Sequence, residues 1–337
     1  MSSDLVLEAK GIETHFLSRG EPVKAVRGVS FSLARGEKLG IVGESGSGKS
    51  ALALTVLGLL DPPGKVVGGE VWLHGRRLDL ADEREWSSVR GRHISLVYQD
   101  PMVALDPVKT IGWQIAEVIR RHNPAIGRAA LRRRVVELLR EVGVGDAERR
   151  ADSYPHQYSG GMRQRVVVAM ALANDPDVLI ADEPTTALDV TTQAQVLDLL
   201  DRLTTDHGSA VILITHNMGV VAEFCDRVLV MYAGRIVEEA STSELFAHQA
   251  HPYTEALLSA VMRPDQLPRG PLPTIPGAPV ALDALPDGCA FAPRCPVRQA
   301  KCELEPPPNV ELGGLGHGKA ECHFAVERTK AAPALPR

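Results

Sequence analysis

The stretch Gly43–Ser50, GESGSGKS, has the residue types and the spacing of a loop that binds phosphate. An apolar run of strand length, Lys38–Val42, precedes it, and an apolar run of helix length, Ala51–Leu60, follows it. In this context glycines let the backbone turn tightly and point its N–H groups at anionic oxygens, while the start of the helix adds partial positive charge. We therefore expect the stretch to bind a nucleoside triphosphate.

Two side chains of this loop have specific expected roles. Lys49 can reach the β- and γ-phosphates, and the Ser50 hydroxyl can ligate Mg²⁺. A Gly/Ser turn that happens to end in Lys-Ser is the alternative, but the flanking strand and helix favour the phosphate loop. The loop residues expected around the phosphates are Gly43, Glu44, Ser45, Gly46, Ser47, Gly48, Lys49 and Ser50.

A second candidate feature is the pair Asp182-Glu183, which ends the apolar run Val178–Ala181. A strand that ends in acid beside the phosphate-loop strand places a carboxylate in the Mg²⁺ shell of such proteins. We expect Asp182 to contact Mg²⁺ and Glu183 to polarise the attacking water as general base. A surface turn after a core strand is the alternative, which pairing with the phosphate loop disfavours.

A third feature is Ser159-Gly160-Gly161, which precedes a predicted helix over residues 162–173. A serine hydroxyl, glycine N–H groups and a helix N-terminus together form an anion site. An ordinary serine cap is the alternative. The order of the features favours the functional interpretation, because Gln99 follows one predicted strand and His216 follows another.

The remaining pattern predicts an α/β fold. The Arg-rich helix over 128–142 is interpreted as having a solvated face rather than a nucleic-acid patch, because aromatic residues are not interleaved with its arginines. Strands are predicted within 5–42 and at 68–73, 93–98, 178–181 and 211–215, and helices at 112–122, 128–142, 162–173 and 191–205.

Length and charge restrict the class of protein. The 337 residues suffice for one large domain and a smaller one, and the net charge of −5 argues against a nucleic-acid partner. No run approaches 18 apolar residues and no secretion signal is visible, so we expect a cytoplasmic chain with reduced thiols. Cys225 is expected to be a small buried helix residue.

The C-terminal part differs in composition. Residues 264–308 contain twelve prolines, which predicts an irregular extension rather than more α/β sheet. Four of the five cysteines lie after residue 288, separated by gaps of five, six and nineteen residues and without a CxxC pair. This spacing leaves an iron–sulfur cluster, zinc and unligated thiols open. The four are Cys289, Cys295, Cys302 and Cys322.

The order GESGSGKS, Gln99, YSGGMRQR, LIADEP, TALD and Thr215-His216 resembles the ATPases of the ATP-binding-cassette (ABC) family across roughly residues 5–250. The resemblance implies a P-loop NTPase with a RecA-like core, an antiparallel β subdomain and a helical subdomain at about 100–165. It implies that Phe16 stacks on adenine and that His216 holds the γ-phosphate. It also implies that Gln99 links the Mg²⁺ and γ-phosphate region to the helical subdomain.

The same resemblance implies a composite site. Tyr158, Ser159, Gly160 and Gly161 would belong to the segment that binds the γ-phosphate of ATP held by an opposite subunit, and Asp189 would cross the dimer interface. Glu183, His216 and Gln99 would form the catalytic set, and Ser50, Gln99 and Asp182 the Mg²⁺ set.

A narrower resemblance lies in QDPMVALDP, HPYTEALLSAV, TIPGAPV and GCAFAPRCP, which are similar to the ATPases of oligopeptide/dipeptide importers and their nickel-carrying relatives. It implies an ATPase domain over 1–250 and a C-terminal extension over 251–337. It also implies ATP, Mg²⁺ and a 4Fe–4S cluster on the four thiolates, with zinc as the second option.

The partners implied are a second ATPase subunit (in a heterodimer or a homodimer), two membrane permeases and an extracytoplasmic binding protein, at the cytoplasmic face of the membrane and without nucleic acid. An importer of nickel or another small solute is one alternative. A non-transport ABC ATPase of DNA repair or ribosome work is another, although neither a long coiled coil nor a second cassette is visible.

Overall fold

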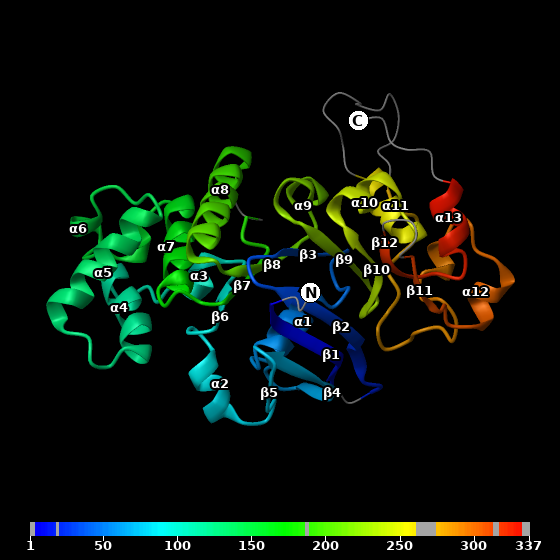
Figure 1. The fold of residues 1–337 in the computed structure, drawn as a ribbon, viewed down its shortest axis with the longest axis horizontal. Coiled ribbons are helices and arrows are strands. Elements are labelled where there is room, and N and C mark those ends of the chain that lie inside the picture. The colour runs from blue at the N-terminus through cyan, green and yellow to red at the C-terminus, as the bar shows by residue number, and fades with distance from the viewer. Residues whose placement is uncertain (1–3, 18–19, 186–188, 261–273, 313–316, 332–337) are drawn as a thin grey trace. The chain divides into compact units, whose positions relative to one another are not determined.

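The computed structural model describes residues 4–17, 20–185, 189–260, 274–312 and 317–331 (Figure 1). The chain divides into two compact units whose segments alternate along the sequence. Unit 1 comprises Met1–Leu7, Leu33–Glu37 and Leu73–Ile212. Unit 2 comprises Glu8–Ser32, Lys38–Trp72 and Leu213–Arg337.

Unit 1 contains a parallel strand pair, β6 (Ile94–Val97) and β7 (Val178–Asp182), in register from Ile94 opposite Val178 to Val97 opposite Ala181. The first four residues of β7 are buried, as expected for a strand covered on both faces. Of the described residues, unit 1 also contains β5 (Arg76–Leu78), and β8 (Ala210–Thr215) contains the boundary between the units.

The helices of unit 1 follow the hydrophobic pattern of the sequence. In α5 (Arg128–Glu141) the buried side chains fall on one face, whereas Arg132 pairs with Asp152 and Arg134 with Glu141 nearer the surface, which agrees with the predicted solvated face. The others are α2 (Glu83–Val89), α3 (Pro101–Ala104), α4 (Ile111–His122), α6 (Ala147–Arg150), η1 (Pro155–Gln157), α7 (Gly160–Leu172) and α8 (Val190–His207).

Unit 2 contains most of three strands bonded in the order β2 (Val23–Ala34), β1 (Leu5–Phe16) and β4 (Gly64–Leu73). Its other strands follow the order β11 (Asn309–Glu311), β12 (His317–Glu321), β10 (Arg235–Ser241), β9 (Arg227–Tyr232) and β3 (Lys38–Val42). Only the β3–β9 pair among these is parallel. The helices are α1 (Lys49–Val56), α9 (Met218–Phe224), α10 (Thr242–Ala247), α11 (Pro252–Ser259), η2 (Ala292–Arg294), α12 (Ala300–Leu304) and α13 (Ala325–Ala331).

Two predicted elements differ in the structure. Helix α1 ends at Val56 rather than Leu60, because Gly58 takes φ +60° and the Leu59 N–H turns back to the Leu54 carbonyl. Strand β4 begins at Gly64 rather than Gly68. Cys225 is buried as predicted, but it lies one residue beyond α9.

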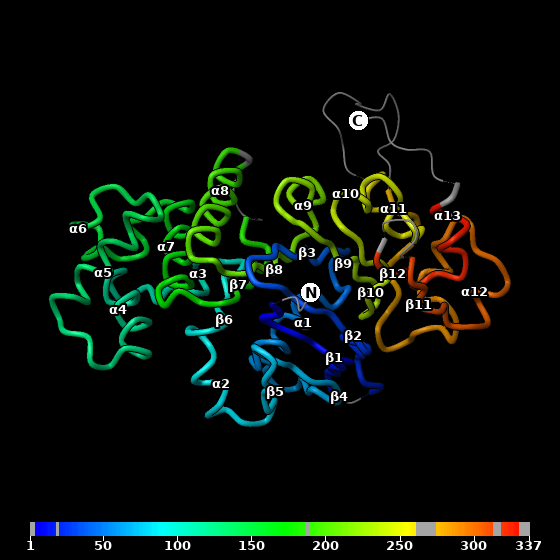
Figure 2. Tube along the Cα trace, in the orientation of Figure 1, coloured from blue at the N-terminus to red at the C-terminus, as the bar shows by residue number. Residues whose placement is uncertain are grey.

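The C-terminal segment is partly irregular and partly sheet. The described residues 274–299 form loops and the single turn η2, as the prolines predict; Figure 2 traces this stretch as an open coil. Beyond the proline-rich segment, however, β12 pairs with β10 and β11 pairs with β12, so the chain returns to extend the sheet. Among the described residues, none of the helices has the length and apolar character needed to cross a membrane.

A buried carboxylate anchors the chain after β10. Glu238 is 1% exposed, and its carboxylate accepts hydrogen bonds from the N–H groups of Ala250 (2.8 Å) and His251 (2.9 Å). Burial raises the pKa of Glu238 to about 7 and lowers the pKa of His251 to about 3. His251 is therefore neutral, and its Nδ1 accepts from the Tyr253 N–H at 3.0 Å.

We predict that Glu238 makes the stability of the protein depend on pH. Its pKa in the folded protein exceeds the ordinary carboxyl value, so the folded state binds the proton more tightly and stability falls as pH rises from about 4.5 to about 7. Glu238→Gln cannot ionise and keeps an acceptor. The stability of wild type relative to this variant should fall by about 3 kcal/mol between pH 4.5 and pH 8 in urea unfolding.

The matched control is Glu305→Gln, whose side chain is exposed in the same unit. Its stability relative to wild type should not follow this pattern. A difference between wild type and Glu238→Gln that stays constant across this pH range would contradict the prediction.

Candidate nucleotide-binding site

The loop Gly43–Ser50 joins β3 to α1, the strand–loop–helix context that the sequence predicts. Lys49 is only 6% exposed, and its Nζ donates to the carbonyls of Gly43 (2.8 Å) and Glu44 (2.9 Å). The Ser47 N–H donates to the Glu44 carbonyl at 3.2 Å. The loop thus curls around the lysine ammonium, and Ser50 lies exposed in the first turn of α1.

Glycine is required at the point where this loop enters the helix. Gly48 caps α1 with φ +104°, a left-handed conformation that side chains rarely adopt. A Cβ at this position would lie 2.2 Å from the Ala25 carbonyl oxygen, and one at Gly43 would lie 2.2 Å from the Met231 carbonyl oxygen. The loop is therefore pressed against the backbone of two other segments of unit 2, which fixes its shape.

The C-terminal segment holds the same loop through Glu44. The buried guanidinium of Arg294 forms a bidentate ion pair with the Glu44 carboxylate, with N–O distances of 2.6 and 2.9 Å. The Arg294 Nε also donates a hydrogen bond to the Pro276 carbonyl. The Tyr253 hydroxyl accepts from the Glu44 N–H at 2.7 Å. Two residues from beyond residue 250 therefore bind the second residue of the phosphate loop.

Aromatic packing positions these two residues. Tyr253 is fully buried, with its ring centroid 4.6 Å from that of Tyr232 and 5.4 Å from that of Phe291. The guanidinium of Arg294 lies 6.0 Å from both the Tyr232 and the Phe291 rings. This cluster buries the Arg294–Glu44 pair and strengthens its electrostatic attraction.

In unit 1 the structure brings Gln99 and Glu183 together. Gln99 follows β6, Glu183 follows β7, and the Gln99 Nε2 donates to Glu183 Oε2 at 3.2 Å. Glu183 has φ +47°, a strained conformation for this residue type, of the kind that occurs at functional sites. Asp182 is the last residue of β7 and is partly exposed.

The start of α7 is exposed. Ser159 caps this 13-residue helix and accepts from the Met162 N–H at 3.3 Å, and both Ser159 and Gly160 are exposed. Gly161 packs against α8, since a Cβ there would lie 2.7 Å from Thr192 Cγ2. Tyr158 is buried and its hydroxyl donates to the Arg150 carbonyl at 2.7 Å, so its side chain supports the turn before the helix.

Three further predicted residues lie at element boundaries. Asp189 is exposed and caps α8 by accepting from the Thr192 N–H and hydroxyl, hydrogen bonds that lower its pKa. His216 is exposed directly after β8, and Phe16 ends β1 partly buried. The roles of these residues toward a nucleotide stay predictions.

The four C-terminal cysteines line one cavity in unit 2, together with His251, Phe291 and Phe324. Amide groups point at three of the sulfurs: the Phe324 N–H donates to Cys322 Sγ at 3.4 Å, and the N–H groups of Phe291 and Val297 bond Cys289 and Cys295. Burial raises the pKa of all three thiols, that of Cys289 to about 11. Hydrogen bonds from backbone N–H groups to sulfur are a feature of thiolate–metal centres.

The spacing of the sulfurs bears on which metal centre would fit. No three of these described cysteines place their sulfurs within 4.8 Å of one another. A single tetrahedral zinc ion with bonds of about 2.3 Å needs sulfurs about 3.8 Å apart.

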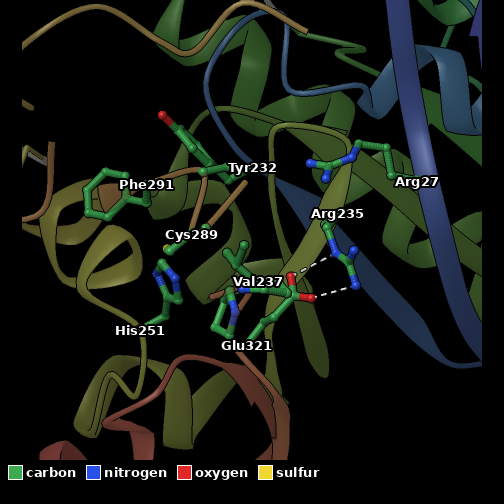
Figure 3. Close-up of a pocket in the computed structure, with 12 residues that line it drawn as sticks. Arg27, Tyr232, Arg235, Val237, His251, Cys289, Phe291 and Glu321 are labelled. Atoms are coloured by element: carbon green, nitrogen blue, oxygen red, sulfur yellow. Dashed lines mark hydrogen bonds and ion pairs between the residues drawn. The ribbon is translucent and has the colours of Figure 1, made fainter. Parts of the chain in front are cut away.

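A second pocket lies next to this cavity and shares His251, Cys289 and Phe291 with it. Figure 3 shows this second pocket, where Arg235 and Glu321 form a bidentate ion pair.

Comparison with protein-family models gives two matches. Residues 26–186 match the model described as ABC transporter. Residues 237–302 match the model described as oligopeptide/dipeptide transporter, C-terminal region.

Curated relatives and solved structures agree with these matches. The chain is 51% identical to the oligopeptide transport ATP-binding protein OppD of Mycobacterium tuberculosis, over 91% of this chain and 50% of that protein, so it spans about half the length of that relative. It is 46% identical to the dipeptide transport ATP-binding protein DppD of Lactococcus lactis, over 93% of this chain and 89% of that protein. The dimeric cassette MJ0796, solved in a post-hydrolysis state with ADP and Pi, is 29% identical with a TM-score of 0.63, covering 70% of this chain and 98% of that one.

These likenesses define an ABC-type ATP-binding cassette and confirm the predicted fold class. The chain belongs to the ABC transporter ATPase subunits of the oligopeptide/dipeptide importer family.

Sequence reasoning missed Arg294 and Tyr253 as parts of the site. Both lie in stretches that carry the family resemblance, GCAFAPRCP and HPYTEALLSAV, but neither is next to a phosphate motif. A buried arginine needs an acidic partner. The apolar residues around Arg294 therefore could have indicated that it is buried and pairs with an acid. The partner, Glu44, is 250 residues away along the chain and could not be identified from spacing.

We predict that Arg294→Lys weakens ATP binding by roughly tenfold, because lysine cannot reproduce the two-pronged pair that holds Glu44. The measurement is the Kd for ATP under conditions without turnover. Arg298→Lys is the matched control, since Arg298 lies in the same segment and forms a longer, exposed ion pair with Glu303. Equal ATP affinities for the two folded variants would show that the Arg294–Glu44 pair does not shape the loop.

Proposed function

We propose that this chain is the ATP-hydrolysing subunit of an importer for peptides. The observation that carries the proposal is the position of Arg294, which lies within the oligopeptide/dipeptide-type C-terminal region and binds Glu44 of the phosphate loop. This contact between the segment typical of peptide importers and the loop Gly43–Ser50 supports the proposal. The names of the relatives, which are oligopeptide and dipeptide transport proteins, support peptides as the substrate.

In this proposal the loop Gly43–Ser50 binds the phosphates of ATP and Phe16 stacks on the adenine. Ser50, Asp182 and Gln99 hold Mg²⁺, which neutralises charge on the β- and γ-phosphates. Glu183 accepts a proton from the attacking water, and His216 holds the γ-phosphate. The hydrogen bond from Gln99 to Glu183 and the strained backbone of Glu183 support the assignment, because both orient that carboxylate.

We further propose that turnover needs two cassettes. Ser159, Gly160 and Gly161, supported by Tyr158, would contact the γ-phosphate of ATP bound by the other subunit, and Asp189 would lie at the interface. The exposed N-terminus of α7 supports this, since its N–H groups and dipole suit an anion from outside the chain. The dimeric form of the related cassette MJ0796 also supports it.

The partners and the site of action follow from the same proposal. A second ATPase subunit, similar or identical, would pair with this chain on two membrane permeases, and an extracytoplasmic binding protein would deliver the peptide. The chain would act at the cytoplasmic face of the membrane. Residues 1–250 would form the ATPase domain, with a helical subdomain at about 100–165 that contacts the permeases, and 251–337 the importer-type extension.

We propose that the four C-terminal cysteines hold a 4Fe–4S cluster. The shared cavity, the N–H groups directed at the sulfurs and sulfur separations too wide for one tetrahedral ion support it. The four thiols would lose their protons when they bind the cluster. The bound cluster would then cross-link loops that have little regular structure of their own. We assign it a structural role.

The function is tested by uptake into vesicles. The chain, purified with its permeases and reconstituted in lipid vesicles, should drive ATP-dependent uptake of labelled di- or oligopeptides delivered by the binding protein. Glu183→Gln should bind ATP but lose turnover and uptake by about 10²–10⁴-fold, because an amide cannot accept the proton. Glu223→Gln, on the exposed face of α9, is the control.

Uptake of Ni²⁺ without peptide uptake would assign the chain to the nickel-carrying relatives. Turnover of Glu183→Gln within a few-fold of wild type would overturn the assignment of the general base.

The cluster is tested by composition. Anaerobically purified protein should contain about four irons and four labile sulfides per chain. Cys295→Ser should lose them and expose the C-terminal segment to protease, whereas Cys225→Ser, which alters a buried thiol outside the cavity, should keep them. One zinc per chain would replace the cluster by a zinc site, and metal-free protein with a protease-resistant segment would contradict both.

A further inference from the structure

Three side chains of unit 1 that lie outside the nucleotide-binding residues converge at one point. Asp177 Oδ2 is 2.7 Å from His93 Nδ1 and 3.1 Å from His74 Nε2. One ring nitrogen from each histidine and one carboxylate oxygen all lie within 4.8 Å of one another. Among the described residues this is the single group of three such ligands at that spacing.

The backbone fixes all three positions. His93 and Asp177 immediately precede the paired strands β6 and β7, and the His93 carbonyl accepts the Val178 N–H at 2.9 Å. His74 follows β4 in a turn with φ +48°, next to Gly75 with φ +73°, and its N–H donates to the Val6 carbonyl at 2.9 Å. Ligands carried by a sheet register and a tight turn keep their spacing without a bound ion.

The spacing agrees with metal geometry. Bonds of about 2.0–2.1 Å from a tetrahedral ion to nitrogen and oxygen place the ligand atoms about 3.3 Å apart. The observed 2.7 and 3.1 Å are shorter than this by about 0.6 and 0.2 Å, and the two ring nitrogens lie within 4.8 Å of each other, so small side-chain movements would reach metal geometry. The side chains of His74 and His93 are about 40% exposed, so an ion has a direct path in and water can complete its coordination.

We propose that His74, His93 and Asp177 form a binding site for a divalent transition-metal ion of the Zn²⁺ type. Two imidazoles and one carboxylate select such ions over Mg²⁺ and Ca²⁺, which prefer oxygen ligands. The ion takes the ring nitrogens that otherwise share protons with Asp177 Oδ2. Protein nitrogen and oxygen atoms fill three positions, and water fills the rest.

The proposed metal site lies at the opposite end of strands β6 and β7 from the residues proposed for hydrolysis. His93 and Asp177 lie at the amino ends of β6 and β7, whereas Gln99 and Glu183 follow their carboxyl ends. Strands of this length separate the two ends by about 13–16 Å. A bound ion would therefore tie the β6–β7 pair to the turn after β4, and it would stabilise unit 1 without entering the hydrolytic step.

The experiment is a Zn²⁺ titration of the full chain by calorimetry, at a pH where the imidazoles are neutral. His74→Ala and His93→Ala should each remove one equivalent of Zn²⁺ or weaken it at least tenfold, and Asp177→Asn should do the same. The thiols of unit 2 are unchanged in these variants, so any loss relative to wild type belongs to the three ligands.

His207→Ala is the matched control, since His207 pairs with Asp175 at 2.9 Å in the same unit without a third ligand at metal spacing. It should bind Zn²⁺ as wild type does. Zn²⁺ should also raise the Tm of wild type more than that of His93→Ala. Equal stoichiometry and Kd for wild type and all three ligand variants would contradict the proposed metal site. The three side chains would then be held only by hydrogen bonds to one another.

Discussion

The ion pair between Arg294 and Glu44 is the contact on which the phosphate loop most depends. Lys49 closes the loop from inside, through the Gly43 and Glu44 carbonyls, and Arg294 holds it from outside through the Glu44 carboxylate. A buried charge without its partner costs about 3–5 kcal/mol, so each member of the pair keeps the other in place. If this glycine-rich loop binds phosphate as proposed, holding it in this way means that less binding energy is lost in ordering it.

Under the proposed function, this constraint would make the C-terminal segment part of the nucleotide site. Arg294 lies between Cys289 and Cys295, and the Cys289 N–H donates to the Cys302 carbonyl at 2.7 Å. Few regular elements hold this segment, so the position of Arg294 depends on the loops around the thiol cavity. A metal centre that cross-links these loops would therefore fix the residue that holds Glu44, and chemistry at the sulfurs would reach the nucleotide through one guanidinium.

What could be predicted from the sequence was what is local. A few consecutive residues are enough to recognise the loop Gly43–Ser50, the cap Ser159 and the strand that ends in Asp182. The structure places each of them on the expected element. The end of α1 was misplaced because an apolar run continues past Gly58, whose backbone conformation stops the helix. Strand β12, HGKAE, has no alternation of apolar residues and forms only because β10 and β11 lie beside it.

Contacts between distant segments could not be predicted. Arg294 and Glu44 are 250 positions apart in the sequence, and Asp177 is 84 positions from His93. His74 joins the last two residues only through the conformation of the turn that it occupies. Single histidines and acids are too common for their types alone to indicate a partner. The four cysteines were recognisable as a group because cysteine is rare and their clustering is uneven, although their spacing left the ligand open.

The pairing of β12 with β10 also has a consequence for the order of events at the ribosome. Strand β10 ends at Ser241, and the strand that covers its free edge begins about 75 residues later. At roughly 5–20 residues per second, the nascent chain presents an uncovered row of N–H and C=O groups for about 4–15 s. Throughout that interval the uncovered edge of β10 offers a template for pairing with any neighbouring nascent strand, so β12, which is synthesised well after the strand it covers, protects the chain against aggregation.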